Sequence, residues 1–501
     1  MRYFLFPGAA AMLGAVASPV AAAPDDGPSN SGPAVLAANK AFANHDCAQV
    51  ASILAPIIAL PSTAEPADLS RIYDISISCA MQTKDMAKAT DFAKHAIALP
   101  EVSDFAWHMA IGLSFDAKDF GGGIDIIDRM LADGRRETLN TIDPRWLVRA
   151  QFALQQMGDD ANETRLLAIL ADPAYDPADV QAQIESIGDY ARALYARKLL
   201  AAGKRDEARA MVSDIKGYET MAQVAFDPGL SALLGGPVDL RAVVEADLAR
   251  HRALSAHYSR ALSAITEVSF DLRRLGRYDE DIAFLTAAIP DVEKPGSFGD
   301  GDDKLPWFWN ALAYGYFMTG KYDAMVAALK KGNRPNKDGS PNGDLVLNLA
   351  GYQVDFDRPK DALATLDTLS GVPGITPGGS MRFHLSHGCA AAELADLKGA
   401  RADLAYALAH EKDDPATVTG LELCVGDDDA AAASYIRRLK DTNHETRKNA
   451  ILALADYDSL DPRAPKSPFA DREKRVRKRP DVVAALRAVG GPVRIHLQVE
   501  P

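Results

Sequence analysis

The sequence predicts an all-α protein built from repeated pairs of antiparallel helices. Alanine is frequent throughout the 501 residues and runs of Val and Ile of strand length are scarce, which favours helix over strand. Apolar residues recur at helical spacing in short blocks that end at glycines or other turn residues. Because a chain of this length exceeds one compact core, we expect an elongated array of hairpins or several domains.

Residues 1–23 have the features of a secretory signal peptide. Arg2 precedes an apolar stretch that Pro7 interrupts, and a site of small residues ends at Ala23. We therefore expect cleavage after Ala23, a flexible mature N-terminus over residues 24–32, and a periplasmic or secreted protein. The alternative is an uncleaved membrane anchor, although the apolar stretch is shorter than the roughly 20 residues that span a bilayer.

The four cysteines fall into two groups with similar spacing. Cys47 and Cys79 are 32 residues apart, and Cys389 and Cys424 are 35 apart. Export to an oxidising compartment would allow disulfides to persist. Of the three connectivities we favour the two local pairs, because each spacing is close to the length of one helix hairpin. The alternative is that the thiols are free and buried.

The clearest hairpin lies in residues 309–329. Trp309 and Ala313 belong to an apolar stripe at helical spacing, Gly320 ends this helix, and a second stripe begins at Tyr322. Glycine reaches the left-handed backbone conformation of such a turn at low steric cost. The small side chain of Ala313 would let the two helices approach closely.

The same outline returns along the chain, with a turn residue between the two helices of each copy. These turn markers are Lys84, Lys118, Gly158, Gly203, Gly276, Gly320, Asp357 and Gly399. Successive markers lie 34 to 45 residues apart, except for an interval of 73 residues that begins at Gly203. We expect this interval to contain a degenerate unit whose turn is at residues 235–237. Internal repeats of this period are typical of solenoids.

The pattern resembles the tetratricopeptide repeat family, whose units are antiparallel helix pairs stacked into a superhelix. The residues that carry the resemblance in the best copy are Trp309, Leu312, Ala313, Tyr316, Gly320 and Tyr322. Those in the copies before and after it are Val268, Leu272, Gly276, Tyr278, Leu349, Ala350 and Ala362. Met325 and Asp281 depart from the family, which usually has alanine there, and several units exceed its length. The resemblance implies an α-solenoid over residues 33–458.

Residues 459–501 are expected to form a Pro-rich basic linker with a short helix near 480–489 and a strand near 493–499. The segment 471–480 is strongly basic, whereas the whole chain has a formal net charge of −14. This acidic body argues against nucleic-acid binding. The basic tail could make a weak contact with an anionic membrane surface or an acidic protein face. The alternative is a solvated linker.

Motifs that carry chemistry are incomplete. The H-E-x-x-H zinc motif begins at His410 and at His444, but the second histidine is missing in both cases. His384, His387 and Cys389 would form a metal corner without a fourth ligand, and Cys389 is expected in a disulfide. Nucleophile elbows and phosphate-binding glycine loops are absent from the sequence. We therefore predict no catalytic, cofactor-binding or metal site, and a protein that is not an enzyme.

The resemblance implies that the first helix of each pair lines a concave groove for a peptide or protein. Carried over to the better copies, the groove residues are Phe270, Arg273, Asn310, Tyr314 and Phe317. Aromatic side chains beside an arginine are typical of protein-recognition hot spots. The alternative is that these residues pack against adjacent hairpins.

Together these observations predict a non-enzymatic exported scaffold that mediates protein–protein interaction in the cell envelope. A second hypothesis is a factor that binds or processes cell-wall glycan or another polymer, because helical superhelices can also hold extended carbohydrate. A third is an architectural role in which the basic tail rests on a membrane or a partner. The sequence leaves the partner's identity and the oligomeric state open.

Overall fold

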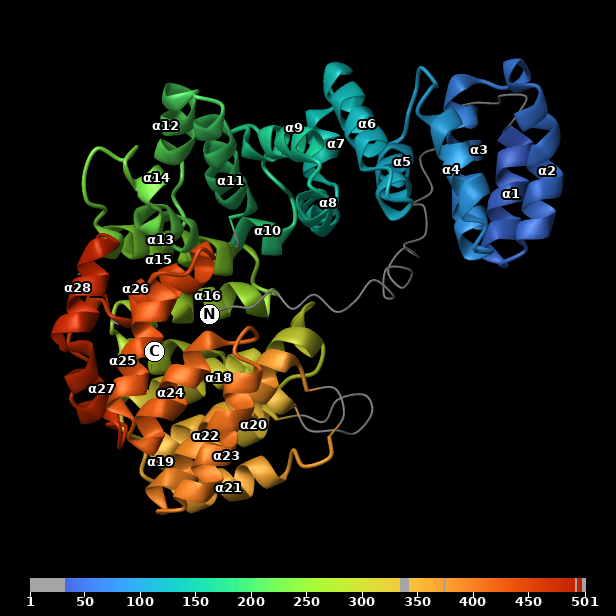
Figure 1. The fold of residues 1–501 in the computed structure, drawn as a ribbon. Coiled ribbons are helices and arrows are strands. Elements are labelled where there is room, and N and C mark those ends of the chain that lie inside the picture. Colours follow the sequence, from blue (N-terminus) through green and yellow to red (C-terminus); the bar gives the residue numbers. More distant parts are fainter. Residues whose placement is uncertain (1–31, 185, 334–341, 373–374, 492, 498–501) are drawn as a thin grey trace. The chain divides into compact units, whose positions relative to one another are not determined.

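The computed structural model describes residues 32–184, 186–333, 342–372, 375–491 and 493–497 (Figure 1). Most of these residues are helical and the two strands have only two residues each, so the predicted all-α class is confirmed. The proposed signal peptide, residues 1–23, lies outside the described residues. No described helix combines the length and the apolar character needed to cross a bilayer. The chain divides into two compact units, residues 1–138 and residues 139–501.

Unit 1 contains three helix hairpins in its described part. Its elements are α1 (Gly32–Ala43), α2 (Cys47–Ala59), η1 (Pro61–Thr63), α3 (Pro66–Gln82), α4 (Met86–Ala96), α5 (Asp104–Asp116) and α6 (Phe120–Ala132), with α7 (Arg136–Asn140) at its boundary. Leu54, Ile72 and Ile124 are completely buried where the hairpins stack. Each such side chain contributes about 1.5–3 kcal/mol through its removal from water.

Unit 2 continues the same architecture. Its first helices are α8 (Pro144–Met157), α9 (Asp160–Ala171), α10 (Val180–Ile184), α11 (Ile187–Ala201), α12 (Arg205–Ser213), α13 (Tyr218–Phe226), α14 (Pro228–Ser231) and α15 (Leu240–His257). The next are α16 (Leu262–Arg274), α17 (Tyr278–Val292), α18 (Gly301–Met318), α19 (Tyr322–Gly332), α20 (Gly343–Asp355), α21 (Pro359–Asp367), α22 (Pro377–Glu393), α23 (Leu397–Ala409), α24 (Pro415–Val425), α25 (Asp428–Leu439) and α26 (His444–Ala453). The degenerate unit expected after Gly203 is present, since α13 and α15 pack together on either side of Gly235.

The turns between paired helices use the left-handed backbone conformation at most of the predicted markers. Lys84, Lys118 and Asp357 have φ values of 60°, 61° and 56°, although none is a glycine. The last marker is corrected by the structure, because Gly399 lies inside α23 and the left-handed residue is Ala395, with φ 62°. The N–H of Gly399 instead bonds to the side chain of Asp396, which caps α23.

The residue after the left-handed position is the N-cap of the second helix, and it is of one of two kinds. In six hairpins it is an aspartate, one of the preferred N-cap residues, that accepts a hydrogen bond from a backbone N–H of the first turn. These aspartates are Asp46, Asp85, Asp119, Asp159, Asp396 and Asp427. In four central hairpins a lysine or arginine stands there without a side-chain cap: Lys204, Arg277, Lys321 and Arg358. A left-handed residue followed by aspartate is therefore a local turn signal in this chain.

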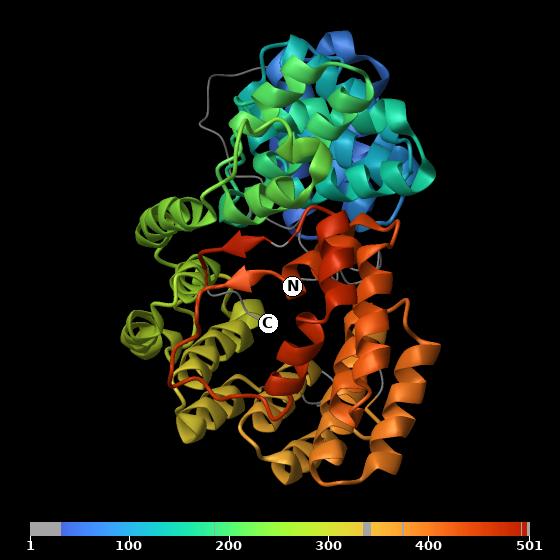
Figure 2. The same cartoon turned by 60° about the vertical axis from the view of Figure 1, so that its left-hand side comes forward.

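The C-terminal segment folds back on unit 2 instead of extending from it. After α26 come β1 (Asp456–Tyr457), α27 (Ala470–Arg477), α28 (Pro480–Ala488) and β2 (Arg494–Ile495). The two strands pair in parallel, with Asp456 opposite Arg494 and Tyr457 opposite Ile495. In Figure 2 this red segment lies between the yellow-green helices and the orange helices of unit 2. The basic part, expected to be a linker, is helical as α27, because Ala, Arg, Glu and Lys are strong helix formers.

Candidate partner-binding surface

The predicted groove residues lie on α16 and α18, the first helices of two adjacent hairpins. Arg273 stacks between two aromatic rings, with its guanidinium carbon 4.3 Å from the ring centre of Phe270 and 4.7 Å from that of Tyr314. Cation–π contacts of this kind stabilise a buried arginine. Only 2% of Arg273 is exposed, so it joins two hairpins rather than facing a partner.

Tyr314 and Phe317 belong to an aromatic cluster between hairpins. The ring of Phe317 stacks on Tyr352 of α20 at 4.5 Å and meets Phe356 edge-on at 5.7 Å. Tyr314 is 5% exposed and Phe317 is 6% exposed. The expectation of an open aromatic groove is therefore corrected for Arg273, Tyr314 and Phe317, because large aromatic side chains fill the space between stacked helices.

Asn310 is the predicted groove residue that opens onto a polar surface. Its side-chain oxygen accepts a hydrogen bond of 2.8 Å from the amide of Asn348 on α20. The guanidinium of Arg382 on α22 in turn donates to the side-chain oxygen of Asn348 and lies 3.8 Å from Asp344. We call Asn310, Asn348 and Arg382 the amide–arginine row. It crosses three successive first helices, and its side chains are partly or largely exposed.

An exposed aromatic residue extends the row. Trp307 is 40% exposed and lies three residues before Asn310 on α18, so the two share a helix face. Sequence reasoning missed Trp307, Asn348 and Arg382. The available signal was the repeat itself, since Asn310, Asn348 and Arg382 are separated by 38 and 34 residues.

Two histidines of α22, the helix that carries Arg382, contact the carboxylate of Asp403. Nδ1 of His384 is 2.7 Å from one carboxylate oxygen of Asp403, and Nδ1 of His387 is 2.8 Å from the other. Hydrogen bonds from these rings lower the pKa of Asp403 against the effect of burial, and the bond to Asp403 raises the pKa of His387. His384 also borders a cavity of about 370 Å³ with Ser380 and Phe383.

The histidines and Cys389 do not come together as metal ligands. Cys389 forms a disulfide with Cys424, so its sulfur is not a thiolate. Within the part of the chain that the structure describes, no group of three or more His, Cys, Asp or Glu side chains could hold a metal ion. The shared carboxylate instead fixes the orientation of two imidazole rings between α22 and α23.

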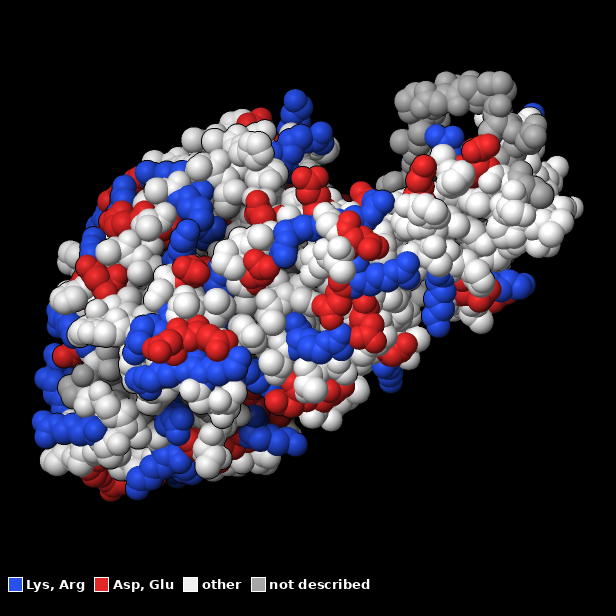
Figure 3. Space-filling view, turned by 90° about the horizontal axis from the view of Figure 1, so that it is seen from above, with Lys and Arg blue, Asp and Glu red and all other residues white. Residues whose placement is uncertain are grey.

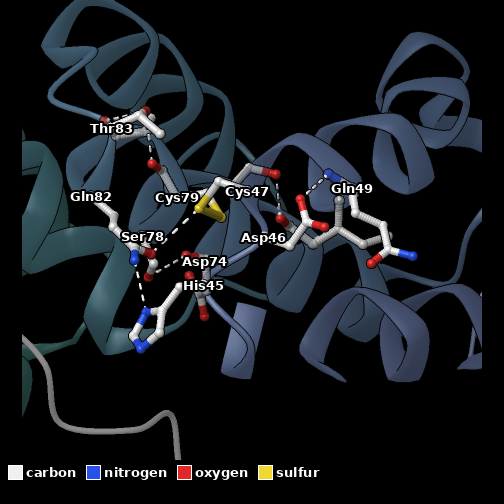
Figure 4. Close-up of a disulfide and its surroundings, with 12 residues drawn as sticks. His45, Asp46, Cys47, Gln49, Asp74, Ser78, Cys79, Gln82 and Thr83 are labelled. Carbon is white, nitrogen blue, oxygen red and sulfur yellow. Dashed lines mark hydrogen bonds between the residues drawn. A yellow bond between two sulfur atoms is a disulfide. The ribbon is translucent and has the colours of Figure 1, made fainter. Parts of the chain in front are cut away.

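Both local cysteine pairs favoured by the spacing are joined. Cys47 at the start of α2 bonds to Cys79 near the end of α3, and both lie in a well-packed cluster (Figure 4). Beside this bond the amide of Gln82 donates to Nδ1 of His45 at 2.8 Å. Each disulfide links neighbouring hairpins, and their presence is compatible with an oxidising compartment.

The basic tail is bonded to the array. Arg472 and Arg475 lie 3.4 and 3.5 Å from Asp428, and Arg479 lies 2.5 Å from Asp429. On the face shown in Figure 3 the Lys and Arg side chains are interspersed with Asp and Glu and do not gather in one broad patch. A weak contact between this tail and an anionic membrane stays a prediction.

The helix hairpins define the architecture. Paired helices join through tight left-handed turns and stack on the next pair through buried Ala, Leu and aromatic residues, as at Trp309 and Ala313. The described residues are therefore stacked antiparallel helix hairpins. No protein-family model matches the sequence, and no curated protein matches it.

Solved structures of helical proteins match it along most of its length. The structure of the APC/C hetero-tetramer Cut9–Hcn1 is 13% identical with a TM-score of 0.30, and the match covers 93% of this chain and 97% of that one. Yeast Tom70 is 11% identical with a TM-score of 0.34, over 91% and 98% of the two chains. The TPR domain of P58(IPK) is 14% identical with a TM-score of 0.21, over 78% and 96%. At these scores the likeness says nothing about partners or activity.

Proposed function

We propose that this protein is an exported, non-enzymatic scaffold that binds an extended segment of another envelope protein along the amide–arginine row. The observation that supports this proposal is the alignment of Asn310, Asn348 and Arg382 across three successive first helices. Side-chain amides offer both donors and acceptors, which suits the backbone of an extended peptide. Arg382 adds a cation that can bind a carboxylate with two parallel hydrogen bonds.

Trp307 gives this surface an apolar anchor. Tryptophan and arginine are among the residue types in which binding energy concentrates at protein interfaces, and Trp307 is 40% exposed. The row is partly exposed, whereas the deeper aromatic cluster around Phe317 is buried and holds the hairpins in place. The first helices thus combine a packed aromatic interior with a polar surface that a partner can bind.

Export is the second part of the proposal. The disulfides between Cys47 and Cys79 and between Cys389 and Cys424 support an oxidising location. We propose that residues 1–23 direct the chain there and are then removed. Mass spectrometry of the mature protein tests this step, because an intact N-terminus on the exported chain would contradict it.

Photo-crosslinking in living cells tests the binding surface. A photoreactive phenylalanine derivative replaces Trp307, an exchange of one exposed aromatic side chain for another. The matched control replaces Leu408 of α23, which is 49% exposed on the second helix of its hairpin. We expect a recurrent protein adduct at position 307 that is absent at position 408 and decreases at least tenfold with Asn348→Ala and Arg382→Ala combined.

Each outcome of this experiment decides between hypotheses. One protein that recurs at position 307 supports the scaffold and identifies the partner. Adducts with glycan alone would instead support the glycan-binding hypothesis. Absence of any adduct from folded, exported protein would overturn the proposed surface.

A further inference from the structure

The C-terminal segment crosses the ends of several hairpins of unit 2. The guanidinium of Arg463 bonds to Asp279, at the start of α17, at 2.8 and 3.1 Å. The carbonyl oxygen of Arg463 lies 2.6 Å from where a side chain on Gly320 would begin, so the segment passes directly over the turn between α18 and α19. Ala464 packs against the aromatic cluster of the same hairpin. The contacts thus join residues that are far apart in sequence.

The next residues of the segment rest on α20, α22 and α24. Ser467 lies beside the carboxyl group of Asp355 and lowers its pKa. Phe469 packs on a cluster formed by Val354 and the disulfide-bonded Cys389 and Cys424. Arg472 then donates to the carbonyl oxygen of Leu423 near the end of α24 at 2.5 Å, and cations are favourable at helix C-termini.

Carboxyl groups gather at the C-terminal ends of α20 and α22, two of the helices on which this part of the segment rests. Asp355 is the last residue of α20 and Glu393 is the last residue of α22, so both lie at the negative ends of helix dipoles. Asp357, in the turn after α20, acts electrostatically on Glu393, and Glu473 of α27 acts on Asp355. The charged groups that raise the pKa values of Asp355 and Glu393 are all carboxylates, so they repel one another when ionised.

The environment of these two carboxyl groups favours their uncharged forms. Both oxygens of Glu393 are shielded from solvent and have no hydrogen-bond partner among the described residues. Burial raises the pKa of Asp355 to about 6, a shift that the nearby Ser467 reduces. Burial, followed by the charges of Asp357 and Asp355, raises the pKa of Glu393 to about 7. Ionisation of either group in this environment therefore costs free energy.

We propose that residues 459–479 form a pH-sensitive strap, which holds the ends of α20 and α22 tightly when Asp355 and Glu393 are uncharged and loosens when both are ionised. This inference does not depend on the proposed partner surface. The strap is anchored on one side by Arg463 and on the other by Arg472, whose bonds persist across this pH range. Loosening is therefore expected between these anchors, at Ser467 and Phe469.

The direction of the pH effect follows from the raised pKa values. An acid whose pKa is higher in the closed state keeps its proton longer there, so closure is favoured at low pH. The contribution of the two carboxyl groups to closure is complete below the ordinary carboxyl pKa near 4. It declines as the pH rises through about 6 and about 7. The strap therefore closes more firmly at pH 5.5 than at pH 7.5.

Hydrogen exchange of the full exported chain tests the proposal. We expect amide protection in residues 463–473, corrected for the intrinsic exchange rate, to fall on the order of tenfold between pH 5.5 and pH 7.5. Protection in α18 serves as the internal control for the fold. Equal protection of residues 463–473 at both pH values would overturn the proposal.

Substitutions identify the groups responsible. The pair Asp355→Asn and Glu393→Gln mimics the uncharged carboxyl groups in size, so we expect strong protection at both pH values. The matched control Asp303→Asn removes an exposed carboxylate from α18 and should retain the wild-type pH dependence. If the double variant fails to fold, Glu393→Gln alone should lose most of the pH dependence. Wild-type pH dependence in a folded Glu393→Gln variant would assign the effect elsewhere and contradict the strap.

Discussion

Unit 1 and the C-terminal half of unit 2 use the same two stabilising features for different purposes. Each has a disulfide between cysteines about one repeat apart, and each has an aspartate with a serine beside its carboxyl group. In unit 1 the aspartate is Asp74, 2.8 Å from the hydroxyl of Ser103. In unit 2 it is Asp355, beside Ser467. Burial raises the pKa of both carboxyl groups to about 6.

The two regions differ in how far apart the joined residues are in the sequence. Ser103 is the N-cap of α5 and belongs to the hairpin next to Asp74. Ser467 belongs to the strap, which returns from beyond α26 to meet α20. The same chemistry therefore holds adjacent repeats together in unit 1 and closes distant parts of the chain in unit 2. Local features follow from repeat length, whereas the strap contacts do not.

Removal of the disulfides should have the largest effect on stability, and it should affect the two regions differently. We expect Cys47→Ser with Cys79→Ser, or Cys389→Ser with Cys424→Ser, to lower the free energy of unfolding by about 2–4 kcal/mol. Denaturant unfolding measures this loss. Only the second pair should also reduce hydrogen-exchange protection of the strap, because Phe469 packs on that disulfide.

The two disulfide variants serve as controls for each other. Equal loss of strap protection in both would show that the strap responds to general destabilisation. No loss in the variant without Cys389 and Cys424 would contradict the contact between Phe469 and that disulfide.

The buried aspartate of unit 1 gives the next largest effect. Asp74→Asn should increase the free energy of unfolding at pH 7 by up to about 3 kcal/mol, because the ionised carboxylate is costly to bury and asparagine can still accept from Ser103. The raised pKa means that the wild-type chain loses this stability as pH rises from about 4 through about 6. The gain should therefore be small at pH 4. Denaturant unfolding at both pH values measures it, and an equal gain at both would contradict the assignment.

Two glycines with the same backbone conformation allow a turn that the strap covers to be compared with an open turn. Gly320 and Gly203 have φ values of 71° and 77°, and only Gly320 lies against the strap. Alanine at Gly203 should cost about 1 kcal/mol from the left-handed conformation alone. Alanine at Gly320 should cost at least about 1 kcal/mol more, because its methyl group meets the backbone of Arg463. Equal melting temperatures of the two variants would contradict the close passage of the strap.

Substitution in the histidine cluster should have the smallest effect on stability, but its effect on the NMR titration should be clear. Asp403→Asn removes the carboxylate that raises the pKa of His387, so that pKa should fall. NMR titration of the ring protons measures it. Stability from the wild-type contact is present below the ordinary histidine pKa and lost as pH rises through the raised one. An unchanged titration of His387 would show that Asp403 does not set its charge.

Much of the local structure was predictable because short-range features encode it. Helix periodicity and turn residues place the hairpin at Trp309, and the repeat length places Cys47 close to Cys79 and Cys389 close to Cys424. The one displaced turn, at Ala395 instead of Gly399, arose because the aspartate cap defines the helix start more strongly than the glycine does.

The sequence by itself determined the all-α class, the paired helices and the favoured cysteine pairs, because each depends on residues no more than about one repeat apart. Only the tertiary structure decided that Arg273 and Tyr314 are buried, while Asn310 is joined to Asn348 and partly exposed. Residues on one helix have the same periodicity whether a neighbour covers them or not. The position of the strap could not be predicted from the sequence either, since it depends on side chains that meet only when the distant hairpins of unit 2 have stacked.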